Sequence, residues 1–253
     1  MTELKPPPHL SPSSIGTWKQ CPLKFKYSKI DGIREPPTEA TLMGNFVHEI
    51  LEDVYALEPE ERTIDVARQI ARRIWDEKYS SEVHGYVHTK KLNDFRWNSW
   101  FCVENLWALE QPSETFINGI EYELNGQIEG VTLKGFIDRY SLVDGHMVIG
   151  DYKTGKVPRK QWEEDKFTQL FIYSALVQEL GVAEVDQVEL LYLKGPKKIS
   201  REVTPQHIEE VTETIVTVKH EIDKACEDEN FPTVKSKLCD WCFFKKQCPA
   251  WRR

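Results

Sequence analysis

The hydrophobic pattern of the chain changes after Gln111, and this change constrains the fold more than any other feature of the sequence. Before it, apolar residues recur with helical spacing, in residues 42–57, 64–79 and 92–109. After it, short apolar stretches favour strands, in residues 119–124, 131–142 and 146–152. Between these stretches stand Asn125-Gly126 and Asp144-Gly145, dipeptides that favour tight hairpin turns.

The remainder of the chain alternates helical and strand patterns. A helix is predicted over about 161–180, then strands at 185–193 and 199–203, and a last helix over about 205–229. This order predicts an α/β fold in a single domain of 253 residues. Its expected parts are a helical lobe at about 41–111, an α/β core at about 112–204, and a C-terminal helix with a cysteine segment at 205–253.

Composition places the chain among globular proteins, because hydrophobic residues make up 40% and aromatic residues 11%. No apolar run approaches the roughly 20 residues that cross a bilayer, and residues 1–10 lack the features of a signal peptide. We therefore expect a soluble, intracellular, cytoplasmic protein without a membrane partner. Four aromatic residues are expected to pack in the core rather than to stack on bases: Trp97, Trp100, Phe101 and Trp107.

The formal net charge of −8 has the opposite sign to that of most nucleic-acid binders. It does not exclude them, because binding needs only a local basic groove. Basic residues cluster at four places along the chain: Lys24, Lys26 and Lys29; Arg159 and Lys160; Lys194, Lys197 and Lys198; Lys245, Lys246, Arg252 and Arg253.

Two acids and a lysine stand near the ends of consecutive predicted strands. Asp151 and Lys153 are two residues apart, so in a strand their side chains project to the same side. The preceding strand carries Asp138. If the two strands pair across Asp144-Gly145, both carboxylates converge on one site.

Two adjacent carboxylates repel each other, and a divalent cation relieves that repulsion. Mg²⁺ prefers oxygen ligands and can polarise a phosphodiester and activate a bound water. Lys153 is then placed to hold the attacking water or to neutralise charge that develops on the phosphate. The pattern predicts metal-dependent hydrolysis of phosphodiesters.

Residues 150–156 also come close to a P-loop, the phosphate-binding motif of many ATPases. Val157 replaces the Ser or Thr whose hydroxyl binds Mg²⁺ in that motif, and Asp151 would put a negative charge into the phosphate cradle. The sequence therefore disfavours an ATPase.

Four segments together resemble the RecB-like branch of the PD-(D/E)XK nuclease superfamily: Gly44 to His48, Gly135 to Arg139, Gly150 to Gly155, and Gln169 to Tyr173. They occur in the order of the family and span most of the chain. The resemblance implies a restriction-endonuclease-like core, in which helices flank a mixed central sheet. It also implies hydrolysis of DNA.

The resemblance also implies roles for individual residues. His48, Asp138 and Asp151, with the backbone carbonyl of Tyr152, correspond to ligands of Mg²⁺ or Mn²⁺, and Lys153 corresponds to the catalytic lysine. A further pair lies four residues apart on one helix face and corresponds to residues that position DNA: Gln169 and Tyr173.

Three of the six cysteines are closely spaced near the C-terminus: Cys239, Cys242 and Cys248. A tetrahedral metal site needs a fourth ligand, and Cys21 is the candidate, because a proline follows it as one follows Cys248. Spacing alone favours neither Zn²⁺ nor an iron–sulfur cluster. The other two cysteines, Cys102 and Cys226, have no metal-like neighbours and are expected to be buried or incidental thiols.

The cysteine pattern resembles that of iron–sulfur members of the family, namely AddB-type helicase–nuclease subunits and CRISPR-adaptation nucleases. That resemblance implies a 4Fe-4S cluster that joins the two chain ends, with Zn²⁺ as the alternative.

Three functions are consistent with these features. The first is a DNA exonuclease acting on single strands or DNA ends in recombination, repair or CRISPR adaptation, alone or with a helicase, a recombinase or a CRISPR-adaptation protein. The second is a catalytically inactive DNA-end-binding module of the same fold in a helicase–nuclease or recombination complex. The third is a zinc-stabilised protein-interaction domain.

Overall fold

Five strands form one mixed sheet in the order β1-β2-β3-β4-β5. The computed structural model describes residues 4–252. Strands β3 and β4 pair in parallel and the other neighbours are antiparallel. The bounds are β1 Gly119–Ile128, β2 Val131–Val143, β3 His146–Lys153, β4 Glu184–Tyr192 and β5 Lys197–Glu202. The predicted α/β fold with a mixed, helix-flanked sheet is confirmed.

The parallel pair requires a crossover connection, which α8 (Thr168–Glu179) supplies. This helix is shorter than predicted, because two 3₁₀ turns precede it: η5 (Lys160–Trp162) and η6 (Glu164–Lys166). Glu163 and Glu164 form ion pairs with Arg201 of β5, which hold this polar stretch against the sheet. Residues 170–177 of α8 are all buried, so the helix packs on the sheet along most of its surface.

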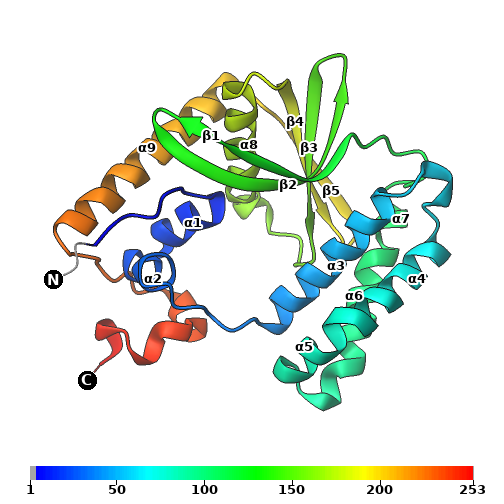
Figure 1. The fold of residues 1–253 in the computed structure, drawn as a ribbon, viewed down its shortest axis with the longest axis horizontal. Coiled ribbons are helices and arrows are strands. Elements are labelled where there is room, and N and C mark those ends of the chain that lie inside the picture. Colours follow the sequence, from blue (N-terminus) through cyan, green and yellow to red (C-terminus); the bar gives the residue numbers. More distant parts are fainter. Residues whose placement is uncertain (1–3, 253) are drawn as a thin grey trace.

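One face of the sheet is covered by α8 and three other helices (Figure 1). These are α1 (Pro12–Gln20), α2 (Pro22–Phe25) and α9 (Pro205–Glu227). The π-helical turn η1 (Lys26–Ile30) follows α2. Side chains of Ser11 and Thr204 cap the N-termini of α1 and α9, which satisfies amide groups that a helix leaves unpaired there.

The other face of the sheet supports the helical lobe, which lies to the right of the sheet in Figure 1. The core of this lobe includes Phe46, Ile50 and Trp75, and it extends to Tyr152 and Leu191 of the sheet. Its elements are α3 Glu39–Tyr55, η2 Pro59–Glu61, α4 Ile64–Ile74, η3 Trp75–Tyr79, α5 Ser80–Tyr86, η4 Thr89–Lys91, α6 Leu92–Glu104 and α7 Leu106–Leu109.

The prediction that the aromatic residues around α6 are all in the core is wrong for two of them. Trp97 and Phe101 are exposed, with 71% and 52% of their surface accessible. Trp100 is partly buried under the Arg68 guanidinium, 5.0 Å from the ring centre, and Trp107 packs against the lobe core. Helical spacing alone did not show that the outer face of α6 has no neighbour in the chain.

One of the two predicted hairpin turns is misplaced. The β2–β3 turn does use Asp144 and Gly145, both with positive φ. Asn125-Gly126, however, lies inside β1, and the β1–β2 turn is at Glu129 and Gly130. A Cβ at Gly126 would come within 2.9 Å of the Leu180 side chain, so packing of α8 requires glycine at this strand position.

The C-terminal segment returns to the beginning of the chain, where it lies beside α2 (Figure 1). The Leu23 amide donates to the Pro232 carbonyl at 3.3 Å, and the rings of Tyr27 and Phe244 are 5.1 Å apart. The segment consists of 3₁₀ turns: η7 Lys237–Trp241, η8 Phe243–Lys246 and η9 Pro249–Trp251. Among residues 4–252, no helix combines the length and the apolar composition that crossing a membrane requires.

Candidate active site

Paired strands bring the two predicted acids to one end of the sheet. The β2–β3 ladder runs to the pair Arg139 and Gly150, and the next residues are Asp138 and Asp151. There the Tyr152 amide donates to Asp138 Oδ2 at 2.8 Å. A side chain thus takes the place of a backbone acceptor, and it fixes the Asp138 carboxylate against β3.

Helix α3 delivers His48 to the same point. Its Nε2 lies 2.8 Å from the carbonyl oxygen of Tyr152, and its Nδ1 lies 3.4 Å from Asp138 Oδ2. Three of the four predicted metal ligands, two side chains and one carbonyl, therefore meet within hydrogen-bonding or ion-pair distance.

The charges at this point are costly without a cation. Burial, followed by the charge of Asp151, raises the pKa of Asp138 to about 8, although the Tyr152 amide and Lys153 act in the opposite direction. Asp151 is 4% exposed. Its Oδ2 lies 2.6 Å from Lys153 Nζ, but no donor among residues 4–252 is oriented to hydrogen-bond to it. A buried oxygen left in this way fits a residue that ligates a divalent ion.

A fifth residue, Glu121 of β1, joins the site, and the sequence analysis missed it. Oxygen or nitrogen atoms of His48, Glu121 and Asp138 all lie within 4.8 Å of one another. Burial, and then the charges of Asp138 and Glu52, raise the pKa of Glu121. The misplaced hairpin turn hid this residue, because only a turn at Glu129 and Gly130 puts Glu121 opposite Asp138.

These groups open onto a cleft of about 700 Å³ between α3, β1 and β2. Its lining is predominantly polar and acidic, apart from Lys78, and includes Asn45, Glu49, Glu52 and Asp53 of α3. The cleft gives a phosphodiester access to the acids from the side of the helical lobe.

Gln169 and Tyr173 approach the same strand end from the other face of the sheet. Gln169 Nε2 donates to Tyr173 Oη at 3.3 Å. The Tyr173 ring packs so closely on Gly135 that a Cβ there would be 2.4 Å from the ring. Burial raises the pKa of Tyr173, and the charges of Asp151 and Asp138 contribute as well. The pair is therefore near the acids, next to the strand that carries Asp138.

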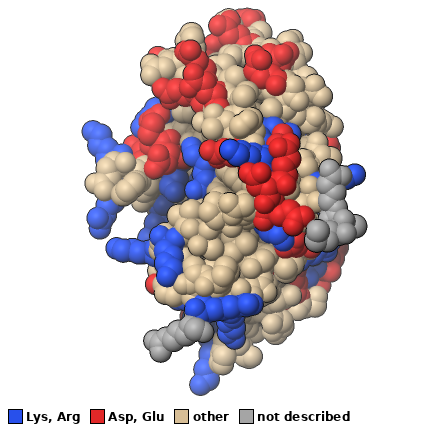
Figure 2. All heavy atoms as spheres, turned by 90° about the vertical axis from the view of Figure 1, so that its left-hand side faces the viewer, with Lys and Arg blue, Asp and Glu red and all other residues tan. Residues whose placement is uncertain are grey.

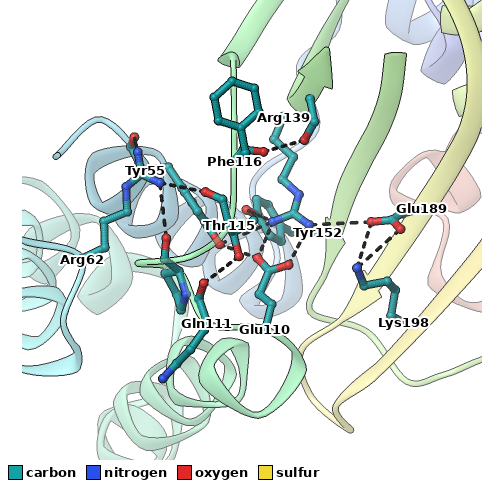
Figure 3. Close-up of polar contacts among 12 residues, drawn as sticks. Tyr55, Arg62, Glu110, Gln111, Thr115, Phe116, Arg139, Tyr152, Glu189 and Lys198 are labelled. Carbon is teal, nitrogen blue, oxygen red and sulfur yellow. Dashed lines mark hydrogen bonds and ion pairs between the residues drawn. The ribbon is translucent and has the colours of Figure 1, made fainter. Parts of the chain in front are cut away.

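A buried network around Arg139 lies behind the acids (Figure 3). Arg139 forms a two-pronged ion pair with Glu110, and its Nη1 donates to Tyr152 Oη at 3.2 Å. Glu189 of β4 lies 3.8 Å from the same guanidinium, and Tyr55 of α3 donates to Glu110. The network joins α3, which carries His48, to the strands that carry the acids.

The charge of Arg139 compensates for the burial of Glu110. Burial acts to raise the pKa of Glu110, but hydrogen bonds and the charge from Arg139 outweigh it and lower the pKa. Gly150 leaves room for the arginine, since a Cβ there would be 2.8 Å from Arg139 Nε. None of these long-range partners was apparent from the sequence.

The four predicted cluster cysteines line one cavity of about 160 Å³ between the two chain ends. Cys21 lies between α1 and α2, and Cys239, Cys242 and Cys248 come from the C-terminal segment. The Ser236 amide donates to the Cys239 sulfur at 3.4 Å and is the main cause of the lowered pKa of that thiol.

The other two cysteines are elsewhere, and both are buried, as predicted: Cys102 and Cys226. Burial raises the pKa of Cys102 to about 11, so this thiol stays protonated.

A mixed sheet with paired acids and a lysine at the end of a central hairpin is the arrangement of a nuclease core. The sequence model of the PD-(D/E)XK nuclease superfamily matches residues 9–249, and the chain therefore belongs to this superfamily.

Comparison with individual proteins agrees with this assignment. The "Gene 69 protein" of Mycobacterium phage D29 is 24% identical, with all of both chains covered. The protein of the same name from Mycobacterium phage L5 is 22% identical, with 97% of each chain covered. A crystal structure from Eubacterium rectale, described as "Putative exonuclease", superposes with a TM-score of 0.59 at 17% identity, covering 92% of this chain and 86% of that one. This similarity shows the fold.

Proposed function

We propose that this protein is a Mg²⁺- or Mn²⁺-dependent deoxyribonuclease of the RecB-like branch, acting as an exonuclease on single-stranded DNA or DNA ends. One observation carries the proposal. The side chains of His48 and Asp138 and the carbonyl of Tyr152 converge next to Asp151, whose buried Oδ2 has no hydrogen-bond donor among the described residues. Superfamily membership supports a nucleic-acid substrate.

The residues fit a divalent cation, which would be held by His48, Asp138, Asp151 and the carbonyl of Tyr152. When bound, such an ion polarises the phosphate and lowers the pKa of a water. Lys153, 2.6 Å from Asp151, supplies a positive charge at the mouth of the site. In our proposal it orients the attacking water and offsets the charge that develops on the phosphate. Gln169 and Tyr173 position the DNA strand from the other face of the sheet.

A basic surface supports DNA as the substrate. We define the basic lobe as residues 10–31 and 231–252, which hold nine lysines and arginines against two aspartates, although the whole chain has a net charge of −8. Figure 2 shows basic side chains over the lower and left parts of this side of the molecule, and acidic ones over the top and right. Trp241 is 80% exposed, and exposed aromatic rings among basic groups suit nucleic acid.

We also propose that Cys21, Cys239, Cys242 and Cys248 hold a 4Fe-4S cluster, with Zn²⁺ as the alternative. All four line one cavity, although one of them is far from the others in sequence. Within residues 4–252 no three of these sulfurs lie within 4.8 Å of one another. A single tetrahedral Zn²⁺ would draw them to about 3.8 Å. A cluster gives absorption near about 400 nm with iron and labile sulfide, whereas zinc gives none.

The proposal treats residues 1–253 as one nuclease domain. The helical lobe supplies His48, the α/β core at about 112–204 supplies the acids and the lysine, and the cysteine segment closes the chain ends. A helicase, a recombinase or a CRISPR-adaptation protein is the kind of partner with which such a domain would act.

The decisive experiment is digestion of end-labelled single- and double-stranded DNA with Mg²⁺ or Mn²⁺. Asp151→Asn and Lys153→Ala should abolish cleavage, and Asp144→Asn should not. Asp144 is a matched control, because it lies in the exposed β2–β3 turn with a left-handed φ of 51° that asparagine tolerates. Metal-dependent cleavage that persists in both site variants would overturn the proposal. DNA binding without cleavage by the wild type would identify an inactive DNA-end-binding module instead.

A further inference from the structure

Glu121 has a backbone conformation that its place in the fold does not require. Its φ is 44°, in the left-handed region that residues with a Cβ seldom adopt. Its neighbours Ile120 and Tyr122 pair regularly with Arg139 and Ile137 of β2, so Glu121 stands opposite Asp138 inside the ladder. No turn or chain reversal occurs at this position.

Glu129 provides an internal comparison. It has nearly the same φ, 47°, but it occupies the β1–β2 turn before Gly130, where positive φ at both residues belongs to a two-residue hairpin. The turn explains the conformation of Glu129. The conformation of Glu121 needs another cause, and unfavourable backbone conformations of this kind concentrate at functional sites.

The carboxylate of Glu121 points to that cause. It shares the space within 4.8 Å with ligand atoms of His48 and Asp138. No hydrogen bond or ion pair among residues 4–252 includes it. A second carboxylate beside Asp138 adds repulsion, which Glu52, also in the cleft, increases. The arrangement is unfavourable unless a cation occupies it.

We infer that Glu121 is a further side-chain ligand of the divalent cation, beside His48 and Asp138. The inference rests on the proposed metal-dependent function and adds a ligand from β1, a strand that the acid–acid–lysine pattern leaves out. Carboxylate oxygens are the donors that Mg²⁺ and Mn²⁺ prefer. The local distortion of β1 turns one such oxygen towards the ion position.

Binding of Mn²⁺ to the full-length protein tests this inference without relying on catalysis. Calorimetry and electron paramagnetic resonance of free Mn²⁺ give the dissociation constant at a fixed pH. Glu121→Gln should raise it about tenfold or more. Asp138→Asn should raise it at least as much, and Glu129→Gln should leave it unchanged. Circular dichroism confirms that each variant is folded.

A pair of glycine variants separates a ligand from an incidental glutamate. Glu121→Gly and Glu129→Gly both remove a Cβ from a left-handed position, so both should raise the Tm of the metal-free protein. Only Glu121→Gly should weaken Mn²⁺ binding, so this variant gains stability as it loses the metal.

The inference is overturned if Glu121→Gln binds Mn²⁺ as tightly as the wild type while Asp138→Asn does not. It stands if the wild type binds Mn²⁺ through Glu121 and Asp138 yet cleaves no DNA, and in that case the proposed function fails alone.

Discussion

The amide of Tyr152 and the carboxylate of Asp138 are joined by a hydrogen bond of 2.8 Å at the point where the β2–β3 ladder ends. The carbonyl of the same tyrosine lies 2.8 Å from His48 Nε2, and its hydroxyl accepts from Arg139. One residue therefore connects an acid of the site, the histidine of the helical lobe and the buried arginine network. The predictions below examine these connections and the basic lobe.

Gly150→Ala should disturb the site from behind. The new methyl group would be 2.8 Å from Arg139 Nε, so the guanidinium or strand β3 must move. We expect a loss of about 1–3 kcal/mol in the free energy of unfolding and a drop in metal-dependent cleavage. Gly155→Ala is the control, since a Cβ there has no neighbour within 4 Å. Denaturant unfolding measures the difference, and equal stability of the two variants would contradict the packing argument.

Glu110 should make the protein sensitive to acid. Its pKa is lowered in the folded state by Arg139, despite burial, so its contribution to stability is present above the ordinary value of 4.5. That contribution is lost as the pH falls below 4.5, because the folded state must then take up a proton that it binds weakly. Glu110→Gln should be less stable at neutral pH and should lose less stability on acidification. Unfolding curves from pH 7 to 3 test this, and parallel curves for both proteins would refute it.

The basic lobe should supply much of the affinity for DNA. Replacing Lys245 and Lys246 by glutamate should weaken binding of single-stranded DNA and reduce its dependence on salt by about 0.7 in the log–log slope per lost phosphate contact. Trp241→Ala should weaken binding by about 1–3 kcal/mol through lost stacking. Trp97→Ala is the matched control, because this tryptophan is also exposed but lies on the helical lobe. Fluorescence anisotropy at several salt concentrations measures both effects, and a similar loss in the control would contradict this role.

Cys21→Ala should uncouple the two ends of the chain. Loss of one of four ligands should remove absorption near about 400 nm and lower the Tm, because the bound group no longer connects α1 and α2 to the C-terminal segment. Cys226→Ala removes a thiol that is buried in another place and should retain the absorption. Anaerobic purification followed by metal analysis checks the result. An unchanged metal content in Cys21→Ala would exclude this cysteine as a ligand.

The sequence predicted those features that depend on local pattern. The acids on β2 and β3 were expected to meet because Asp144-Gly145 is a strong turn signal, and the strands do pair across it. Asn125-Gly126 is an equally strong local signal, yet it lies inside β1, where Leu176 and Leu180 of α8 cover the glycine. Tertiary packing decided between two possible turns, and only the actual one reveals Glu121.

Contacts between distant residues could not be predicted in this way. Arg139 and Glu110 belong to different elements, and no periodicity links them. Likewise, the spacing of Trp97 and Phe101 shows that they share a helix face but not whether another part of the chain covers that face. Such features depend on how the helical lobe sits on the sheet.

The threefold use of Tyr152 has a consequence for evolution and for protein engineering. Exchanging the helical lobe for that of a relative would leave the carboxylates in place but would remove His48, Tyr55 and Glu110 together. A working chimera would need all three residues in matching positions, so lobe and sheet are expected to change in concert and not as interchangeable modules.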